Sequence, residues 1–186
     1  MPSDWRIGTA GEIIELHDAK RIPLSGAQRA KMEKLYPYYG ATSLMDYVDN
    51  YLFDGVYLLL GEDGTVVDDK GFPILQYIDG KFWVNNHAHV LQALPKIADN
   101  QFLAYSINQA NIESLLVGGG RAKLNAETLM EIELTIPSIE EQRTVGVYLQ
   151  HFDNLITLHQ READECKRLK QALTQLLLTG IVRVNK

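Results

Sequence analysis

The sequence has little cysteine and no long apolar run, and each absence excludes a class of protein. Cys166 is the only cysteine in 186 residues, so no internal disulfide is possible and a reducing, cytoplasmic setting is expected. No stretch approaches the roughly 20 consecutive apolar residues of a membrane span. Residues 1–12 lack the apolar run of a signal peptide, so neither secretion nor membrane association is predicted.

The sequence also lacks the short motifs that mark many enzymes. It has no G-x-x-x-x-G-K-[ST] phosphate loop, no G-x-G-x-x-G fingerprint and no G-x-S-x-G nucleophile elbow. The run "VGGGRAKLN", residues 117–125, is rich in glycine but has no strand and helix around it. Its glycines would let the backbone approach a phosphate beside Arg121 and Lys123, although a flexible surface loop explains the composition equally well. No bound cofactor is predicted.

Charge is distributed unevenly along the chain. The net charge is −6, yet residues 139–186 carry +1 and residues 1–138 carry −7. Within the acidic part, residues 20–34 contain a single acid, Glu33, and five bases: Lys20, Arg21, Arg29, Lys31 and Lys34. A local basic patch can bind phosphate even on an acidic protein, and a solvated surface is the alternative reading.

Residues 1–137 mix short apolar runs with turn signals, which predicts a domain of mixed helices and strands. Strands are expected at residues 56–60 and 132–136, where β-branched and aliphatic residues cluster between turn residues. A short helix is expected to begin at Asp99 or Asn100, because either side chain can accept a hydrogen bond from the first helical turn.

Residues 138–180 read as one long helix. Ser138 and Glu141 form an S-x-x-E capping box at its start, and Gly180 suits the position that ends it. An apolar seam with alternating spacings of four and three residues runs between them, and eight of its ten positions are apolar: Val145, Leu149, Phe152, Ile156, His159, Ala163, Cys166, Lys170, Leu173 and Leu177. The seam predicts a coiled coil with a partner helix, and packing on its own domain is the alternative.

The stretch "KFWVNNHAHVL", residues 81–91, places two asparagines and two histidines in an apolar run. Asp79-Gly80 before it predicts the type I′ turn of a hairpin. A strand here would put four side chains on one face: Trp83, Asn85, His87 and His89. His-x-His can chelate a metal, but no H-E-x-x-H or C-x-x-C supplies further ligands. A hydrogen-bonded structural network is therefore favoured over metal binding or base reading by asparagine.

Five segments in this order resemble the specificity (S) subunit of type I restriction–modification enzymes. They are "YPYYGATSLMDYVDNYLFDGVYLLLGEDG", "KFWVNNHAHVL", "GGGRAKLN", "LTIPSIEEQ" and "LLLTG", within a similarity from residue 5 to residue 183. The resemblance implies an α/β (α+β) target-recognition domain with a twisted, mostly antiparallel sheet at 1–137. A long spacer and dimerisation helix at 138–180 and a tail at 181–186 would follow. Family members typically carry two such units, so this chain resembles a half-subunit or a fragment.

The resemblance also implies partners. Spacer helices of this family pair antiparallel, so a homodimer is expected with seven seam residues in contact: Val145, Leu149, Phe152, Ile156, Ala163, Leu173 and Leu177. Such a dimer would read a bipartite, palindromic target in double-stranded DNA. It would hold methyltransferase (M) subunits and, in the full complex, a motor-nuclease (R) subunit. No catalytic residue is expected in this chain, because the chemistry of the family belongs to its partners.

Ten residues are expected to contact DNA: Lys20, Arg21, Arg29, Lys31, Lys34, Tyr38, Tyr39, Thr42, Arg121 and Lys123. Core packing is the alternative for the two tyrosines. The polar residues of the 81–91 stretch look like a signature shared by members that read different targets, so they are expected to be scaffold. Base recognition is expected in three less formulaic segments, at residues 20–34, 62–72 and 92–99.

Two other classes of function stay open from the sequence. The first is a metal-dependent nuclease that uses His87 and His89, for which a bound metal would be diagnostic. The second is a coiled-coil interaction protein whose globular part binds protein instead of DNA. The basic segment 20–34 argues against the second class.

Overall fold

The computed structural model describes residues 2, 5–118 and 121–183, and the chain divides into two compact units, Met1–Gly146 and Val147–Lys186. The strands are β1 Arg6–Thr9, β2 Ile14–Leu16, β3 Tyr36–Tyr39, β4 Leu44–Val48, β5 Phe53–Gly61, β6 Asp63–Gly64, β7 Leu75–Val84, β8 Ala88–Ala93, β9 Ala122–Lys123 and β10 Glu133–Ile136. The α-helices are α1 Gly26–Arg29, α2 Asn100–Asn108, α3 Ala126–Met130 and α4 Ile139–Leu178, and short 3-10 turns lie at Ala10–Glu12, Asp18–Lys20 and Glu113–Leu115. None of the helices in the described residues is long and apolar enough to cross a membrane.

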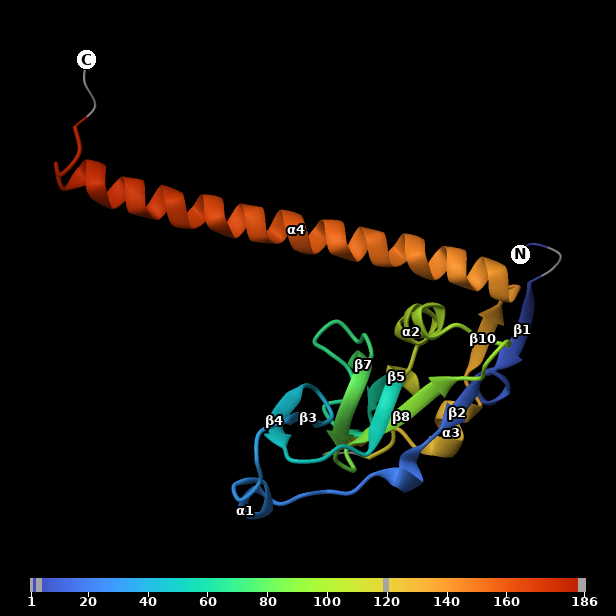
Figure 1. Cartoon of the computed structure of the whole chain (residues 1–186). Coiled ribbons are helices and arrows are strands. Elements are labelled where there is room, and N and C mark those ends of the chain that lie inside the picture. Colours follow the sequence, from blue (N-terminus) through green and yellow to red (C-terminus); the bar gives the residue numbers. More distant parts are fainter. Residues whose placement is uncertain (1, 3–4, 119–120, 184–186) are drawn as a thin grey trace. The chain divides into compact units, whose positions relative to one another are not determined.

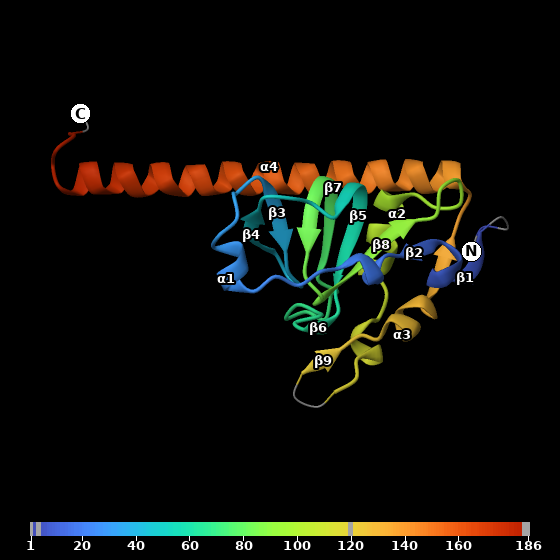
Figure 2. The same cartoon turned by 60° about the horizontal axis from the view of Figure 1, so that its bottom comes forward.

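The first unit is built on a six-stranded sheet with the order β2-β8-β5-β7-β3-β4 (Figure 1). Every neighbouring pair is antiparallel except β3 and β7, which are parallel. Two small ribbons complete the unit: β1 pairs with β10, and β6 pairs with β9 beyond one end of the main sheet (Figure 2). The predicted mixed fold with a mostly antiparallel sheet and a long C-terminal helix is confirmed.

The predicted hairpin turn at Asp79-Gly80 is wrong. Strand β7 runs straight through both residues, and Gly80 lies opposite Gly55 of β5 in the ladder. Gly80 has φ +111° and Gly55 has φ +127°, a region that residues with a Cβ rarely adopt. Two facing glycines therefore allow a local distortion within a continuous pair of strands, where the sequence pattern suggested a reversal of the chain.

The 81–91 stretch is also not one strand. Strand β7 ends at Val84, residues 85–87 form a turn, and β8 begins at Ala88. The turn joins two strands that lie on opposite sides of β5, near opposite ends of that strand. Four Cα steps span at most about 14 Å, whereas the nine residues of β5 extend about 27 Å, so the sheet must coil strongly on itself.

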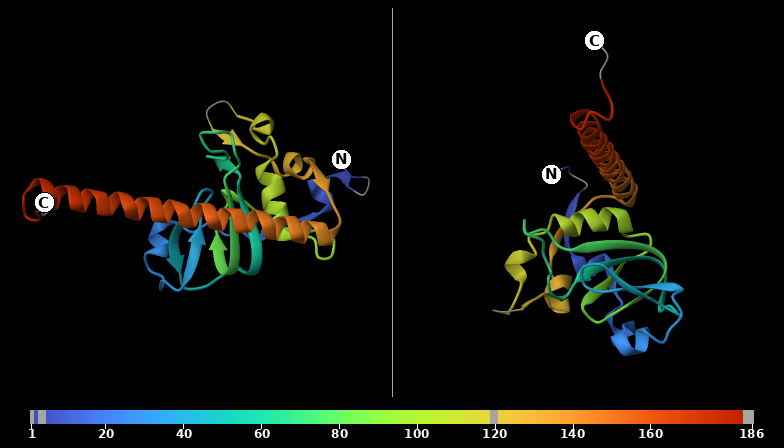
Figure 3. Two further views of the ribbon diagram at one scale, coloured as in Figure 1. Left: turned by 90° about the horizontal axis from the view of Figure 1, so that it is seen from above. Right: turned by 90° about the vertical axis from the view of Figure 1, so that its left-hand side faces the viewer.

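Both faces of the coiled sheet are buried. On one face, alternate residues of β5 and β8 such as Leu58 and Leu91 join a cluster with Leu103 and Ile107 of α2, which lies across the sheet (Figure 3). On the other face, an aromatic cluster fills the space that the coiled sheet encloses, and Phe53 stacks on Phe82 at 5.1 Å between ring centres. Burial on both faces explains why β5 is apolar without alternation.

The start of α4 is anchored within the first unit by Gln142, which is fully buried. Its Oε1 accepts a hydrogen bond from the backbone N of Asp99 at 3.0 Å, and its Nε2 donates to the carbonyl groups of Ile97 and Pro137 at 3.1 and 3.0 Å. The predicted capping box is present, since Ser138 Oγ accepts from Glu141 N at 3.3 Å. The capping box therefore sets where the helix begins, and the buried amide of Gln142 holds its first turns against the rest of the first unit.

The second unit consists mainly of the rest of α4. The helix has 40 residues, a length of about 60 Å. Gly180 follows its end with φ +74°, as predicted for a residue that stops a helix.

Replacement of Gln142 by methionine should lower the free energy of unfolding of the first unit by about 2–4 kcal/mol. The new side chain has a similar length but leaves one buried N–H and two buried carbonyl groups without their partner. Urea denaturation followed by circular dichroism measures the change. The same substitution at Gln150, which is exposed on α4, should change stability by less than about 0.5 kcal/mol, and equal effects at both positions would contradict the anchor.

Candidate functional site

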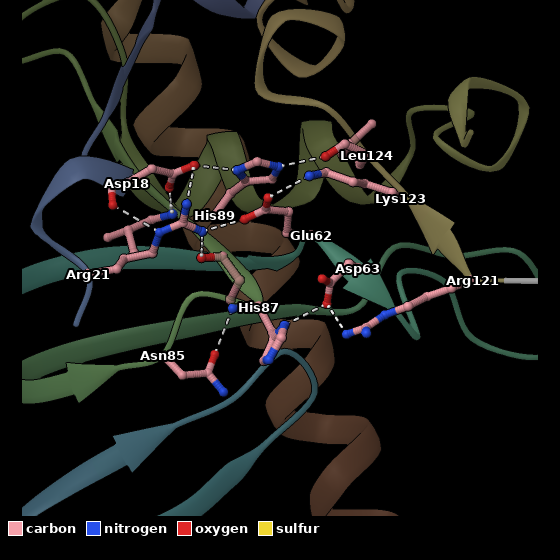
Figure 4. Close-up of polar contacts among 12 residues, drawn as sticks. Asp18, Arg21, Glu62, Asp63, Asn85, His87, His89, Arg121, Lys123 and Leu124 are labelled. Carbon is pink, nitrogen blue, oxygen red and sulfur yellow. Dashed lines mark hydrogen bonds and ion pairs between the residues drawn. The ribbon is translucent and has the colours of Figure 1, made fainter. Parts of the chain in front are cut away.

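His89 is the most deeply buried ionisable residue of the 81–91 stretch, with 1% of its surface exposed. Its Nδ1 lies 2.6 Å from Asp18 Oδ2, and its Nε2 lies 2.9 Å from the carbonyl oxygen of Leu124 (Figure 4). Asp18 also accepts a hydrogen bond from Val90 N at 2.9 Å and pairs with Arg21 at 3.2 Å. Both ring nitrogens of His89 therefore lie beside acceptors, one a carboxylate and the other a carbonyl oxygen.

Arg21 completes the buried part of this network. Its Nη1 lies 2.5 Å from Glu62 Oε2 and donates to the carbonyl oxygen of Ala88 at 2.7 Å, and 13% of its side chain is exposed. The sequence predicted a phosphate contact here. The structure places the guanidinium between Asp18 and Glu62, so a contact with DNA would first have to break these bonds, and the phosphate contact stays a prediction.

Glu62 and Asp63, which we call the acidic clamp, hold the 121–124 segment from one side. Glu62 Oε1 lies 3.4 Å from Lys123 Nζ, and its carbonyl oxygen accepts from Leu124 N at 2.9 Å. Asp63 Oδ1 lies 2.9 Å from Arg121 Nη2 and 2.7 Å from His87 Nδ1. In Figure 4 the two acids lie side by side, with Lys123 and Arg121 reaching back to them.

Asp18, Glu62 and His89 are the group of potential metal ligands found among the described residues, with one ligand atom of each within 4.8 Å of the others. Their potential ligand atoms are already bonded within the protein, because Arg21 lies between the two carboxylates and the ring nitrogens of His89 lie against Asp18 and the carbonyl oxygen of Leu124. The side chain of His87 turns to Asp63 instead. The geometry fits an internal ion-pair network, and the two histidines do not converge on one point as the nuclease alternative requires.

Two residues of the basic segment 20–34, Arg29 and Lys34, form a second cluster with Asp46, which lies outside that segment. Lys34 Nζ lies 2.9 Å from Asp46 Oδ1 and Arg29 Nε lies 3.1 Å from Oδ2. The hydrogen bond from Lys34, followed by one from the backbone N of Tyr47 and that of Arg29, lowers the pKa of Asp46 to about 2. Arg29 is 16% exposed and also lies over the ring of Tyr38, so it too is bound mainly within the protein.

The two predicted tyrosines lie mostly inside the domain. Tyr38 is 1% exposed, and its hydroxyl oxygen accepts a hydrogen bond from Leu24 N at 3.0 Å. Tyr39 packs edge-on against Phe82, and burial raises the pKa of its phenol. Thr42 is exposed in the turn between β3 and β4. Of these three residues, Thr42 is the one free to meet a ligand.

The ten predicted DNA contacts therefore fall into three groups. Three residues are bound mainly inside the protein: Arg21, Arg29 and Tyr38. Three are paired with acids but at least 46% exposed: Lys34, Arg121 and Lys123. Lys20, Lys31 and Thr42 are exposed, and Tyr39 is partly buried. In the glycine-rich run, Gly119 and Gly120 lie outside the described residues, so the predicted approach of their backbone to phosphate stays a prediction.

The acidic partners of these residues were not predictable from the sequence pattern. Asp18 meets His89 across 71 positions of sequence, and Glu62 meets Arg21 across 41. No neighbouring residue in the sequence marks either acid as a partner, and it is the topology of the sheet that brings both acids to His89. A single signal was available in the pattern of 81–91, because a histidine in an apolar run needs buried acceptors.

Helix α4 presents a wide apolar surface in the second unit. Several predicted seam residues are well exposed, with Phe152, Ile156 and Leu173 at 61%, 54% and 55%. A neighbouring row is also exposed and apolar: Tyr148, Leu155, Leu169 and Leu176. Residues 159–168 between the two apolar ends are mostly polar. An exposed apolar surface of this length marks a site of interaction.

A family model described as "Type I restriction modification DNA specificity domain" matches residues 2–168. A putative type I restriction enzyme specificity subunit of Haemophilus influenzae is 33% identical over 134 residues, covering 72% of this chain and 34% of that protein. The specificity subunit of the type I restriction enzyme EcoprrI of Escherichia coli is 30% identical over 168 residues, covering 86% and 39%.

Solved structures show the same fold. The crystal structure of the S subunit of a type I restriction–modification system from M. genitalium matches with a TM-score of 0.67 and 21% identity, covering 81% of this chain and 39% of that one. The HsdS subunit from Thermoanaerobacter tengcongensis matches with a TM-score of 0.60 and 16% identity, covering 95% and 45%. The chain belongs to the family of type I restriction–modification specificity subunits and spans less than half the length of each of these relatives.

Replacement of His89 by leucine should lower the free energy of unfolding by about 3–5 kcal/mol, because it leaves the Asp18 carboxylate and the carbonyl oxygen of Leu124 without their buried partner. Thermal or urea denaturation measures the effect. The matched change His87→Leu removes a pair whose histidine is 40% exposed and should cost less than about 1 kcal/mol. If the two variants are equally stable, the buried pair does not have the structural role assigned to it.

Proposed function

We propose that this chain recognises a specific sequence in double-stranded DNA for a type I restriction–modification complex. The observation that carries the proposal is the family match over residues 2–168. In such a complex the chain would hold methyltransferase (M) subunits, and a motor-nuclease (R) subunit would join them. The chain itself would be a non-catalytic, cytoplasmic binding subunit without a cofactor, and the methylated adenine would be flipped into the pocket of the M subunit.

DNA contacts in this proposal come from the exposed members of the predicted set. Lys20 and Lys31 are exposed, and none of the described residues pairs with either of them. Arg121 and Lys123 are exposed cations at the 121–124 segment. Because the whole chain carries −6, attraction to the phosphate backbone would depend mainly on cations without an acidic partner, such as Lys20 and Lys31, and would weaken steeply with salt.

Base recognition is proposed for segments beside these cations. Residues 62–72 begin with the acidic clamp and continue as an exposed loop with Lys70. Residues 92–99 contain Lys96, whose φ of +68° is unusual for a residue with a Cβ. Residues 20–34 contribute their exposed lysines. The buried residues of the 81–91 stretch serve as scaffold in this proposal, because their polar atoms bond within the protein.

The apolar surface of α4 is proposed to pair with the same surface of a second copy. Leu149, Phe152 and Ile156 lie near its beginning, and Leu173 and Leu177 lie near its end, all at least 37% exposed. Pairing would remove this surface from water. A two-fold axis between the copies would present two recognition domains to inverted half-sites, which makes the target bipartite and palindromic.

A map of methylated adenines in DNA tests the proposed function. Cells that carry the methyltransferase subunit with this chain should methylate adenines within one interrupted palindrome, and cells with the methyltransferase alone should not. Long-read sequencing that detects the modified base gives the target, the spacer and the symmetry together. Methylation that does not depend on this chain would overturn the proposal.

The double substitution Leu149→Asp and Ile156→Asp should convert the dimer into monomers, since pairing would bury unpaired charges. Sedimentation velocity measures the mass in solution. The control variant Asn154→Asp and Thr157→Asp adds the same charge to exposed positions outside the seam and should remain dimeric. An unchanged dimer of the seam variant would exclude pairing through this surface of α4.

A further inference from the structure

Arg121 is the most exposed of the ion-paired lysines and arginines described within residues 1–146, with 63% of its side chain exposed. Among the described residues, its hydrogen-bond partner is Asp63, whose Oδ1 lies 2.9 Å from Nη2. Within that part of the chain, the other donors of the guanidinium have no hydrogen-bond partner. A guanidinium with one fixed bond and free donors is suited to a further planar acceptor, because its fork of N–H groups is rigid.

Asp63 is the fixed point of this arrangement. Its side chain is 22% exposed, and the same Oδ1 also accepts from His87 Nδ1 at 2.7 Å. The backbone of Asp63 pairs in register with Lys123 of β9, and Lys123 N in turn donates to the carbonyl oxygen of Val117 at 2.9 Å. Asp63 therefore holds the 121–124 segment in two ways: its backbone pairs with β9, and its carboxylate binds Arg121.

The charges at this place cancel. The carboxylates of Asp18, Glu62 and Asp63 are matched by the three cations Arg21, Lys123 and Arg121. A locally neutral surface attracts phosphate weakly, because binding to any DNA sequence depends on excess positive charge. The geometry instead favours an acceptor that offers directed hydrogen bonds to the free edge of Arg121. In duplex DNA that acceptor is guanine, which presents O6 and N7 in the major groove to arginine.

We propose that Asp63 is a positioning residue for base recognition, and that it holds Arg121 to read a guanine while it suppresses contacts with the phosphate backbone. The inference rests on the proposed DNA-binding function and deepens it. Asp63 restricts the arginine to few conformations, which reduces the entropy lost on binding a base. Its charge also competes with phosphate for the guanidinium, so sequence discrimination improves as attraction to all DNA falls.

The test compares the full chain with Asp63→Asn on a pool of duplexes that contain 30 randomised base pairs. Binding to the unselected pool should become about 2–5-fold tighter, the change that corresponds to release of an exposed ion pair. The slope of log affinity against log salt should steepen by about 0.9, as for one additional phosphate contact. Sequencing of the bound fraction should show that preference for guanine is lost at one position of each half-site.

Three further variants separate positioning from a general change of charge or stability. Asp49→Asn removes one charge from an exposed residue outside the segments proposed for base recognition and should leave affinity, slope and motif unchanged. Arg121→Gln should lose the same guanine, and addition of Arg121→Gln to Asp63→Asn should abolish the gain in affinity. Asp63→Glu keeps the negative charge, so its affinity for the unselected pool should stay as low as that of the unsubstituted chain. A rise in that affinity would contradict the proposal, and this measurement does not require the asparagine variant to fold.

The proposal is overturned if Asp63→Asn and Asp49→Asn have the same affinity and salt slope, or if Arg121→Gln leaves the bound motif unchanged. Failure of the proposed function gives a different result, because the unsubstituted chain would then enrich no motif from the pool. In that case the comparison of the two asparagine variants still decides whether Asp63 holds Arg121 away from phosphate.

Discussion

The arrangement of the first unit depends on one buried polar contact, between His89 and Asp18. The contact joins β8 to the N-terminal segment, and the second ring nitrogen of His89 lies beside the carbonyl oxygen of Leu124. A buried polar pair adds little stability compared with apolar residues, but it is costly to break because the remaining partner loses its hydrogen bond inside the protein. Three segments that are remote in sequence are therefore held together by one histidine ring, and exposed cations such as Lys20 and Lys123 extend from backbone close to these contacts.

Several cations of the first unit form ion pairs with acidic residues of the same unit. Arg21 and Arg29 are mostly buried in their ion pairs, whereas Arg121 pairs with Asp63 at the surface. For a DNA-binding protein this restraint is useful, because free cations raise the affinity for every sequence alike. The acidic character of the chain is thus compatible with DNA recognition: the acids limit where and in which orientation a cation can act.

Features that depend on neighbours in sequence were predictable, and features that depend on strand pairing were not. The helix start at Asp99 and the capping box at Ser138 follow from side chains that bond within three residues. The strand around 56–60 follows from its composition. Asp79-Gly80 failed as a turn because Gly80 meets Gly55 across the ladder, a contact that no local pattern encodes. For the same reason the sequence identified seven basic residues as candidates but not the acids that pair with five of them.

The connection from β7 through residues 85–87 to β8 also has a consequence for the growing chain. Strand β5 is made before either of its neighbours, and β8 covers one of its edges only after residue 93 has been added. Until then the most apolar strand of the protein offers an open row of N–H and C=O groups. Synthesis thus passes through a stage at which pairing with another nascent chain competes with native pairing. The short link that closes the coiled sheet also limits that stage, since few residues separate the completion of β7 from the start of β8.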